Sequence, residues 1–270
     1  MANNSCLRSG KSIALRLAAE GYNVCINDIA ANKLAVDDLV SSIEEKHGRG
    51  RALGFIADVT EAEQVEQMVS ETVTKLGSLH IMVANAGIAH VAHALELTPI
   101  DINRIFSVNF LGVFNCYSAA ARQMIKQGPL QEQKDTKSCR SSRYKILGAS
   151  SIAAFKPFPT LAHYCATKAA VRAYTQTFAI EMAPYGINVN CYAPGIVGTA
   201  MWDLVDEKLG EIEGRVKGES LRKYSTELTA MKRISVPEDV SRVVGGFLCS
   251  RDSDFVTGQT IIVDGGIVFS

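Results

Sequence analysis

The sequence predicts an α/β protein with a doubly wound parallel sheet that is covered by helices on both faces. Short apolar runs alternate with longer amphipathic segments from one end of the chain to the other, which is typical of repeated strand–helix–strand units. Hydrophobic residues make up 47% and charged residues 21% of the 270 residues, a balance that excludes a disordered chain and a coiled coil. No linker divides the chain, so residues 1–270 are expected to form a single domain.

The predicted strands are short runs of apolar residues, several of which end at Asp, Asn or Ser, and β-branched residues are frequent in them. In chain order these strands are 23–28 (NVCIND), 51–58 (RALGFIAD), 80–85 (HIMVAN), 144–150 (YKILGAS), 187–193 (INVNCYA) and 260–264 (TIIVD). The segments between them repeat apolar residues at helical spacing. The predicted helices are 11–20, 33–46, 61–76, 99–126, 162–183 and 237–249.

One segment interrupts this alternation. Residues 127–143 (QGPLQEQKDTKSCRSSR) are polar and longer than a usual connection between a helix and a strand. Their Lys and Arg residues have no interleaved aromatics, so we expect a solvated inserted loop and no nucleic-acid patch.

Charge and cysteine usage restrict the partners and the compartment. The chain has 28 Lys and Arg against 28 Asp and Glu, so no overall field attracts nucleic acid or an anionic membrane. Seven scattered cysteines without framework spacing indicate free thiols in a reducing compartment. No apolar run reaches the roughly 18 residues of a membrane span, and the first residues lack a signal peptide. We therefore expect a cytoplasmic protein without nucleic-acid or membrane partners.

Tyr164 and Lys168 carry the clearest chemical signal. A spacing of four residues on a predicted helix places the phenol and the ammonium on one face, and a fixed positive charge favours phenolate. This pairing suits a general acid or base. Ser150 and Ser151 close a predicted strand at the edge where such sheets bind ligands. His90 and His93 have no third ligand nearby, so we expect them in a loop at the substrate mouth and predict no metal site.

Together these motifs resemble the short-chain dehydrogenase/reductase family over essentially the whole chain. The matching segments are Asp58-Val59, Asn85-Ala86-Gly87, Asn109, Ser151, Tyr164 with Lys168, Pro194-Gly195 with Thr199, and Thr257-Gly258-Gln259 followed by Asp264-Gly265-Gly266. The segments APGIVGTAMWD and VDGGIVFS look like the diacetyl (acetoin) reductase/2,3-butanediol dehydrogenase branch. The resemblance implies a Rossmann-like fold and an NAD(P)-dependent oxidoreductase.

The resemblance assigns four catalytic residues. Tyr164 would pass a proton to or from the substrate oxygen, and Ser151 would stabilise the charge that develops on it. Lys168 would bind the nicotinamide ribose and depress the pKa of Tyr164. Asn109 would hold a water that links Lys168 to solvent.

Cofactor contacts follow from the same resemblance. Asp28 closes a strand where an acid binds the adenosine ribose, which favours NAD over the alternative, NADP; an Asx turn is the other interpretation of this residue. The remaining cofactor-binding positions are Gly10, Asp58, Val59, Asn85, Ala86, Gly87, Tyr164, Lys168, Gly195, Val197 and Thr199.

The N-terminal segment departs from the family pattern. The family begins with an apolar strand and a T-G-x-x-x-G-x-G loop, but alignment of the first helix puts Gly10 at the last glycine, Arg8 at the middle one and Asn4 at the first. Only Met1 and Ala2 remain for the strand, so the first strand is expected to be largely missing. The strands beside that position would lose partners, and the chain is expected to be weakly stable or weak for cofactor.

The expected substrate is a secondary alcohol or ketone, and a small diketone or hydroxyketone is the first expectation. A larger, polyketide-like biosynthetic carbonyl and a degenerate, non-catalytic role remain alternatives. The substrate lid is placed at 200–229. A homo-tetramer or dimer is implied by the family resemblance.

Overall fold

The computed structural model describes residues 7–130 and 143–269, apart from the side chains of Leu7, Arg8 and Ala200. The described strands are β1 (Val24–Asp28), β2 (Ala52–Ile56), β3 (Ile81–Ala84), β4 (Tyr144–Ala149), β5 (Ile187–Pro194) and β6 (Thr260–Val263). Each corresponds to a predicted strand within three residues at either end. All pairings between them are parallel, as the strand–helix alternation predicts.

The helices are α1 (Leu7–Ala19), α2 (Lys33–His47), α3 (Ala62–Leu76), α4 (Pro99–Phe106), α5 (Gly112–Gln127), α6 (Ala162–Met182), α7 (Ala200–Glu213), α8 (Glu219–Leu228) and α9 (Pro237–Val243). The predicted helix 99–126 is divided between α4 and α5 by a π-helical turn at Ser107–Leu111. The predicted helix 237–249 likewise passes from α9 into a π-helical turn at Val244–Leu248. No helix among the described residues is long and apolar enough to cross a bilayer.

Two apolar layers sandwich the strands. One core packs α1, α2 and α9 against the sheets through residues such as Leu17, Val36 and Val240. The other packs α3, α5 and α6 through residues such as Val65, Met124 and Val171. Helices therefore cover both faces, as expected for a doubly wound fold.

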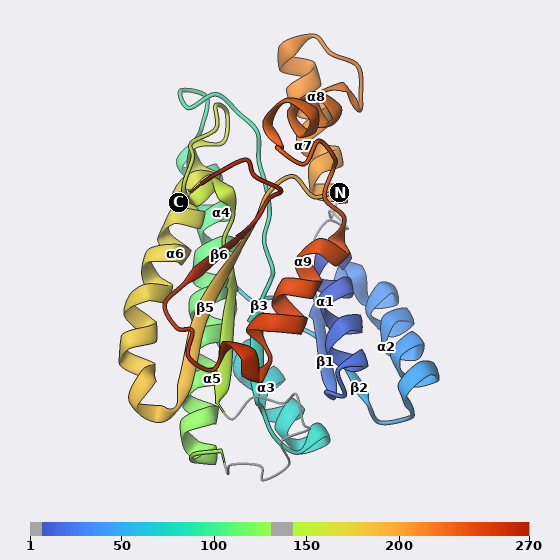
Figure 1. Ribbon diagram of the computed structural model, residues 1–270, viewed down its shortest axis with the longest axis vertical. Coiled ribbons are helices and arrows are strands. Elements are labelled where there is room, and N and C mark those ends of the chain that lie inside the picture. Colours follow the sequence, from blue (N-terminus) through green and yellow to red (C-terminus); the bar gives the residue numbers. More distant parts are fainter. Residues whose placement is uncertain (1–6, 131–142, 270) are drawn as a thin grey trace.

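The strands form two sheets where one was predicted. Among the described residues, β1 pairs with β2, and β3 to β6 form a separate sheet in the order β3-β4-β5-β6. Figure 1 shows β1 and β2 beside α2 on one side, β3 to β6 on the other, and α1 with α9 over the region between them. The absence of a strand between β1 and β3 in this part of the chain agrees with the expected loss of ladder partners.

Two sequence expectations need correction. The first helix begins at Leu7, four residues earlier than predicted, so Gly10 lies inside α1 and not in a loop; Leu and Arg are good helix formers, and no glycine precedes Gly10 to stop them. Asn4 lies outside the described residues. Most of the predicted insertion 127–143 also lies outside them, but Gln127 is the last residue of α5, where its side chain bonds both backbone groups of Leu79.

Candidate functional site

The predicted site residues gather at the carboxyl edge of the four-stranded sheet. Ser151 lies two residues after the end of β4 and caps a short 3-10 helix, where its hydroxyl accepts a bond from the Ala153 N–H at 3.1 Å. Tyr164 and Lys168 lie on α6, one turn apart. The Lys168 ammonium lies 5.6 Å from the centre of the Tyr164 ring, so the geometry confirms that the two residues share a helix face.

Burial dominates the electrostatics of Tyr164. It raises the pKa of the phenol to about 12, while a side-chain hydrogen bond with Ser151 acts in the lowering direction. This corrects the expectation of a depressed pKa. The Lys168 ammonium donates to the Ala149 carbonyl at 2.8 Å. At neutral pH the phenol is therefore protonated and ready to donate its proton.

Asn109 lies in the π-helical turn between α4 and α5 and is fully buried. Its amide oxygen accepts from the Ile88 N–H at 2.8 Å, and its amide nitrogen donates to the Ile88 carbonyl at 3.0 Å and to the Thr167 hydroxyl at 3.2 Å. Single π-helical turns occur frequently at functional sites. Here the turn aims Asn109 so that it ties the segment after β3 to α6.

The ends of β1 to β3 form the adjoining crevice. Asp28 closes β1, and its carboxylate accepts from the Ile29 N–H at 2.8 Å and the Asn32 side chain at 2.9 Å. Asp58 follows β2 and accepts from both donors of Thr60. The Ile29 bond joins neighbouring residues, whereas an Asx turn bonds the N–H two residues on, so these contacts do not show the alternative Asx turn at Asp28.

Asn85 is held in place by Tyr192, a residue that the sequence motifs did not include. Tyr192, in the middle of β5, donates its hydroxyl to the Asn85 amide oxygen at 2.8 Å. A side chain at Gly10 would come 3.1 Å from the Asn85 amide nitrogen, so α1 passes close to the same group. Tyr192 has no motif of its own in the sequence, and only the pairing of strands reveals it.

Two connected cavities lie over these residues. The larger, about 770 Å³, is lined by Asp28, Asp58, Val59 and Ala86, among others. The smaller, about 240 Å³, is lined by Ser151, Tyr164 and Lys168, among others, and by residues of the segment 200–229. Both share Asn85 and Gly87. Of the predicted site residues, the smaller cavity brings together Asn85, Gly87, Ser151, Tyr164, Lys168, Gly195, Val197 and Thr199, and the larger one Gly10, Asp28, Asp58, Val59, Asn85, Ala86 and Gly87. Asn109 lines neither cavity and contacts the site through its hydrogen bonds.

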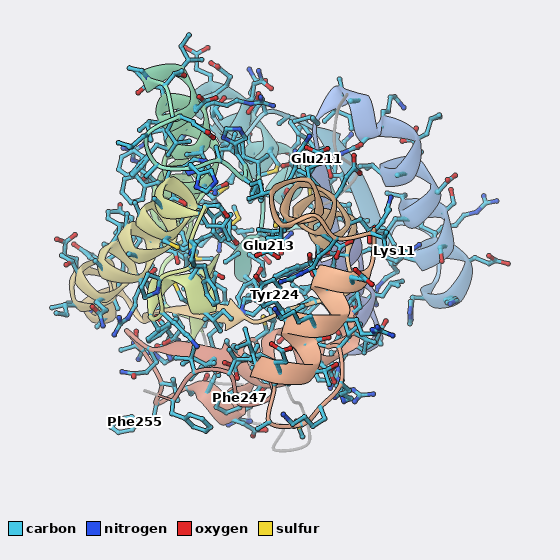
Figure 2. The ribbon with its side chains drawn as sticks, turned by 90° about the horizontal axis from the view of Figure 1, so that it is seen from above. Lys11, Glu211, Glu213, Tyr224, Phe247 and Phe255 are labelled. Carbon is cyan, nitrogen blue, oxygen red and sulfur yellow. The ribbon has the colours of Figure 1, made fainter. Side chains whose placement is uncertain are left out.

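The segment 200–229, which was predicted to be the substrate lid, contains two helices that were not predicted, α7 and α8. Buried Asp206 of α7 accepts from the backbone of Gly218 and Leu221, which fixes α8 on α7. Figure 2, seen from above, shows Glu213 and Tyr224 close together, and the Tyr224 hydroxyl donates to Glu213 at 2.8 Å. Trp202 packs with Val205 and Leu209 over the smaller cavity.

His90, in the loop after β3, pairs with His163 of α6. Nδ1 of His90 lies 3.1 Å from Nε2 of His163, and the two rings meet edge to face. Burial lowers the pKa of His163, and the neighbouring His90 lowers it further. His90 lies in a loop, as expected, but it lines neither cavity, and its place at the substrate mouth stays a prediction. Among the residues that the structure describes, no group of three or more His, Cys, Asp or Glu is placed to hold a metal.

The expected cofactor can be tested against these residues. Asp28, suited to ribose hydroxyls, lines the larger cavity, and Tyr164 lines the smaller one, which shares Asn85 and Gly87 with the larger. A Cβ at Gly195 would come 2.6 Å from Asp264, so only glycine allows this wall of the smaller cavity to pack so closely. These residues fit the two ends of a dinucleotide. The pyrophosphate between them would meet the start of α1 without the glycines of the family loop.

The chain is similar to known proteins over nearly its whole length. Residues 8–268 match a family model described as enoyl-(acyl carrier protein) reductase. The chain is 39% identical to an L-2,3-butanediol dehydrogenase of Corynebacterium glutamicum, over 97% of this chain and 95% of that one. It is 38% identical to an (S)-acetoin-forming diacetyl reductase of Staphylococcus epidermidis, over 96% and 94%. A gluconate 5-dehydrogenase of Burkholderia cenocepacia, solved with NADP and tartrate, superposes with a TM-score of 0.82 at 30% identity and covers 98% of this chain and 92% of its own.

Proposed function

Because the chain belongs to the short-chain dehydrogenase/reductase family, we propose that it transfers hydride between NAD(H) and a small ketone or secondary alcohol in the smaller cavity. Members of this family are NAD(P)-dependent oxidoreductases. What is proposed is the substrate class, the preference for NAD(H) and the residues that carry out catalysis. The catalytic residues are Asn109, Ser151, Tyr164 and Lys168.

The bound cofactor supplies the hydride that reaches the carbonyl carbon. Tyr164 donates its phenolic proton to the carbonyl oxygen, and its raised pKa supports this role because it keeps the phenol protonated at neutral pH. Ser151 donates a hydrogen bond to the same oxygen and stabilises its developing negative charge. In the oxidative direction the same proton returns to Tyr164.

Lys168 and Asn109 support proton transfer by Tyr164 without donating a proton to the substrate themselves. The Lys168 ammonium is buried and bonded to the Ala149 carbonyl, so it holds a fixed positive charge 5.6 Å from the Tyr164 ring. That charge stabilises the phenolate left after proton transfer. Asn109 positions the wall of the site through Ile88 and Thr167. Asn109 is also proposed to hold a water that links Lys168 to solvent, so that a solvent proton replaces the one that Tyr164 gives up.

On the cofactor side, Asp28 is proposed to accept hydrogen bonds from the adenosine ribose. A carboxylate there repels a 2′-phosphate, which favours NAD over NADP. Asp58, Val59 and the Asn85–Gly87 segment line the adenosine end, and Gly195, Val197 and Thr199 line the nicotinamide end. The gluconate 5-dehydrogenase was solved with NADP, so the cofactor preference needs its own measurement.

The size and polarity of the smaller cavity carry the substrate proposal. Its volume of about 240 Å³ is below the usual range of roughly 300–1,000 Å³ for ligand pockets, and the nicotinamide ring has to share it. Leu161, Trp202, Val205 and Leu228 make the lid side apolar. A small vicinal diketone or hydroxyketone fits this space, and the names of the two bacterial relatives support the same class. A larger, polyketide-like carbonyl would require the lid to open.

Steady-state assays with NADH over diacetyl, acetoin and a series of longer ketones test this proposal. We expect diacetyl or acetoin to give the highest kcat/KM. The Tyr164→Phe variant should lose about 10²–10⁴-fold in kcat while its affinity for NADH stays within a few-fold. Tyr174→Phe, which changes another tyrosine of α6 outside the cavity, is the matched control and should keep activity.

A non-catalytic role is the alternative that these assays test. Tight NADH binding without turnover on any ketone would favour it, and full activity of Tyr164→Phe would contradict the assigned chemistry. The dimer or tetramer and the cytoplasmic location implied by the family resemblance remain predictions, which light scattering and microscopy of a tagged chain would test.

A further inference from the structure

A slot lies between the two sheets. Among the described residues, β1 pairs only with β2 and β3 pairs only with β4, so each strand has one edge without a strand neighbour. The lower part of the 770 Å³ cavity lies between these two edges and is lined by both strands. Two strand edges that face one cavity make a template for a further strand.

The backbone of β1 points into the slot at alternate residues. Val24 donates its N–H to the Arg51 carbonyl at 2.9 Å, on the side of β2. Because backbone groups alternate from side to side along a strand, those of Cys25 and Asn27 point away from β2. Both residues line the cavity.

β3 presents its backbone in the same way. The Lys145 N–H donates to the His80 carbonyl at 3.0 Å, on the side of β4. The backbone groups of Ile81 and Val83 therefore point away from β4, and both residues line the cavity. A strand in the slot would find donors and acceptors on both sides.

The two edges run in the same direction. α1 starts next to Asn85, at the carboxyl end of β3, because a side chain at Gly10 would almost touch that residue. It ends at the amino end of β1, where Tyr22 donates its N–H to the Leu17 carbonyl at 3.0 Å. A helix that starts at the carboxyl end of one strand and ends at the amino end of the next joins parallel strands. The occupant would pair in parallel on both sides.

The walls of the slot are apolar on both faces. Ile13 and Leu17 of α1 line it on one face, and Met68, Val113 and Cys116 line it on the other. A strand buried on both faces is apolar at nearly every position. The slot is only the part of the cavity between β1 and β3, so these strands set its length: β1 has five residues and β3 has four, which leaves room for a strand of about five residues.

Charged residues mark the two ends of the slot. Arg143 and Arg251 line the cavity at the amino ends of the strands, and Asp28 lies at the carboxyl end. An occupant with an acidic amino end and a basic carboxyl end complements them. The segments 1–6 (MANNSC) and 131–142 (QEQKDTKSCRSS) contain no run of five apolar residues, so neither matches the chemistry of the slot.

We propose that this slot binds an extended apolar segment of another polypeptide, about five residues long, as a strand parallel to β1 and β3. Addition of a strand to exposed sheet edges is a common mode of peptide recognition. Here the added strand would join the two sheets into one and end beside the start of α1. The carboxyl edge that carries the crevice would thereby become continuous.

Hydrogen exchange on the full chain tests the proposal without relying on activity. The probe is a peptide with five central Val, Leu and Ile residues, two Glu before them and two Lys after them. At 100 times its Kd, exchange at Cys25, Asn27, Ile81 and Val83 should slow about 100-fold, with one peptide bound per chain. A peptide with proline at its centre, which cannot donate there, and a peptide with reversed flanking charges should bind more weakly.

Three results would overturn the proposal. The first is equal binding of the proline peptide, and the second is unchanged exchange at these four amides with any peptide. The third is slow exchange at these amides without any peptide. In a monomer, slow exchange would show that the slot is closed, and in a dimer it would show that a second copy of the chain fills the slot. Where the chain alone does not melt cooperatively, the peptides are added during refolding. Cooperative melting that depends on the apolar peptide supports the proposal, and no difference between the peptides contradicts it.

Discussion

Asn109→Ala should lower stability and activity together. The variant removes the three hydrogen bonds that the side chain makes to both backbone groups of Ile88 and to Thr167. Each bond is worth about 0.5–1.5 kcal/mol net, so the expected loss in the free energy of unfolding is about 1.5–4.5 kcal/mol. For a chain of this size that corresponds to a fall of about 5–15 °C in melting temperature.

Calorimetry and NADH-dependent ketone reduction measure the two effects. Asn188→Ala is the matched control, because this buried amide also makes several side-chain hydrogen bonds, three to backbone carbonyls and one from Arg143, but lines neither cavity. Both variants should melt at lower temperature, and only Asn109→Ala should lose most of its kcat at a temperature where both are folded. An unchanged melting temperature for Asn109→Ala, or equal kcat losses in the two variants, would refute the reasoning.

Three further predictions concern cofactor, pH and substrate. Asp28→Ala should reduce the ratio of kcat/KM for NADH to that for NADPH, because it removes a hydrogen-bond acceptor for the ribose and a charge that repels the 2′-phosphate. Equal kcat/KM for both cofactors in the wild type would contradict the role of Asp28. Burial raises the pKa values of Tyr164, Cys116 and Cys249 to about 12, from 10.0 for tyrosine and 9.0 for cysteine. Above pH 9 the folded state then binds more protons than the unfolded state, so the free energy of unfolding should fall as the pH rises from about 9 to 12. A melting temperature that stays constant over this range would contradict the burial of these groups. Trp202→Ala should shift kcat/KM from diacetyl towards longer ketones, whereas an unchanged order of substrates would exclude Trp202 from the substrate wall.

Local patterns in the sequence account for most of the elements. The strands and long helices were predictable because their apolar residues repeat with clear periods, and Tyr164 and Lys168 meet because a spacing of four residues is one helical turn. The ends of elements were less predictable. A π-helical turn such as Ser107–Leu111 continues the helical pattern, so the sequence does not distinguish it from the helices around it.

Contacts between distant segments could not be predicted. The bond from Tyr192 to Asn85 and the His90–His163 pair join residues that are 107 and 73 positions apart and that belong to no shared motif. The pKa of Tyr164 was expected to fall because the sequence places a lysine nearby. It rises because burial, a property of the whole fold, outweighs neighbouring interactions.

The division of the strands into two sheets could be predicted only in part. The sequence indicates that an apolar strand is lacking before α1, which predicts unpaired edges. It does not predict that β1 and β3 remain apart with an apolar cavity between them. Whether the edges close or stay open depends on the packing of α1, α3 and α5 on the two sheets.

The most direct test of the proposed function follows the hydride itself. NADH that carries deuterium at the transferred position of C4 is incubated with the chain and diacetyl, and the product is examined by mass spectrometry and NMR. The proposed function predicts one deuterium on the carbinol carbon of acetoin in the wild type and in Tyr174→Phe, and almost none with Tyr164→Phe. Acetoin formed without deuterium, or no reduction although NADH binds to the folded chain, would contradict it.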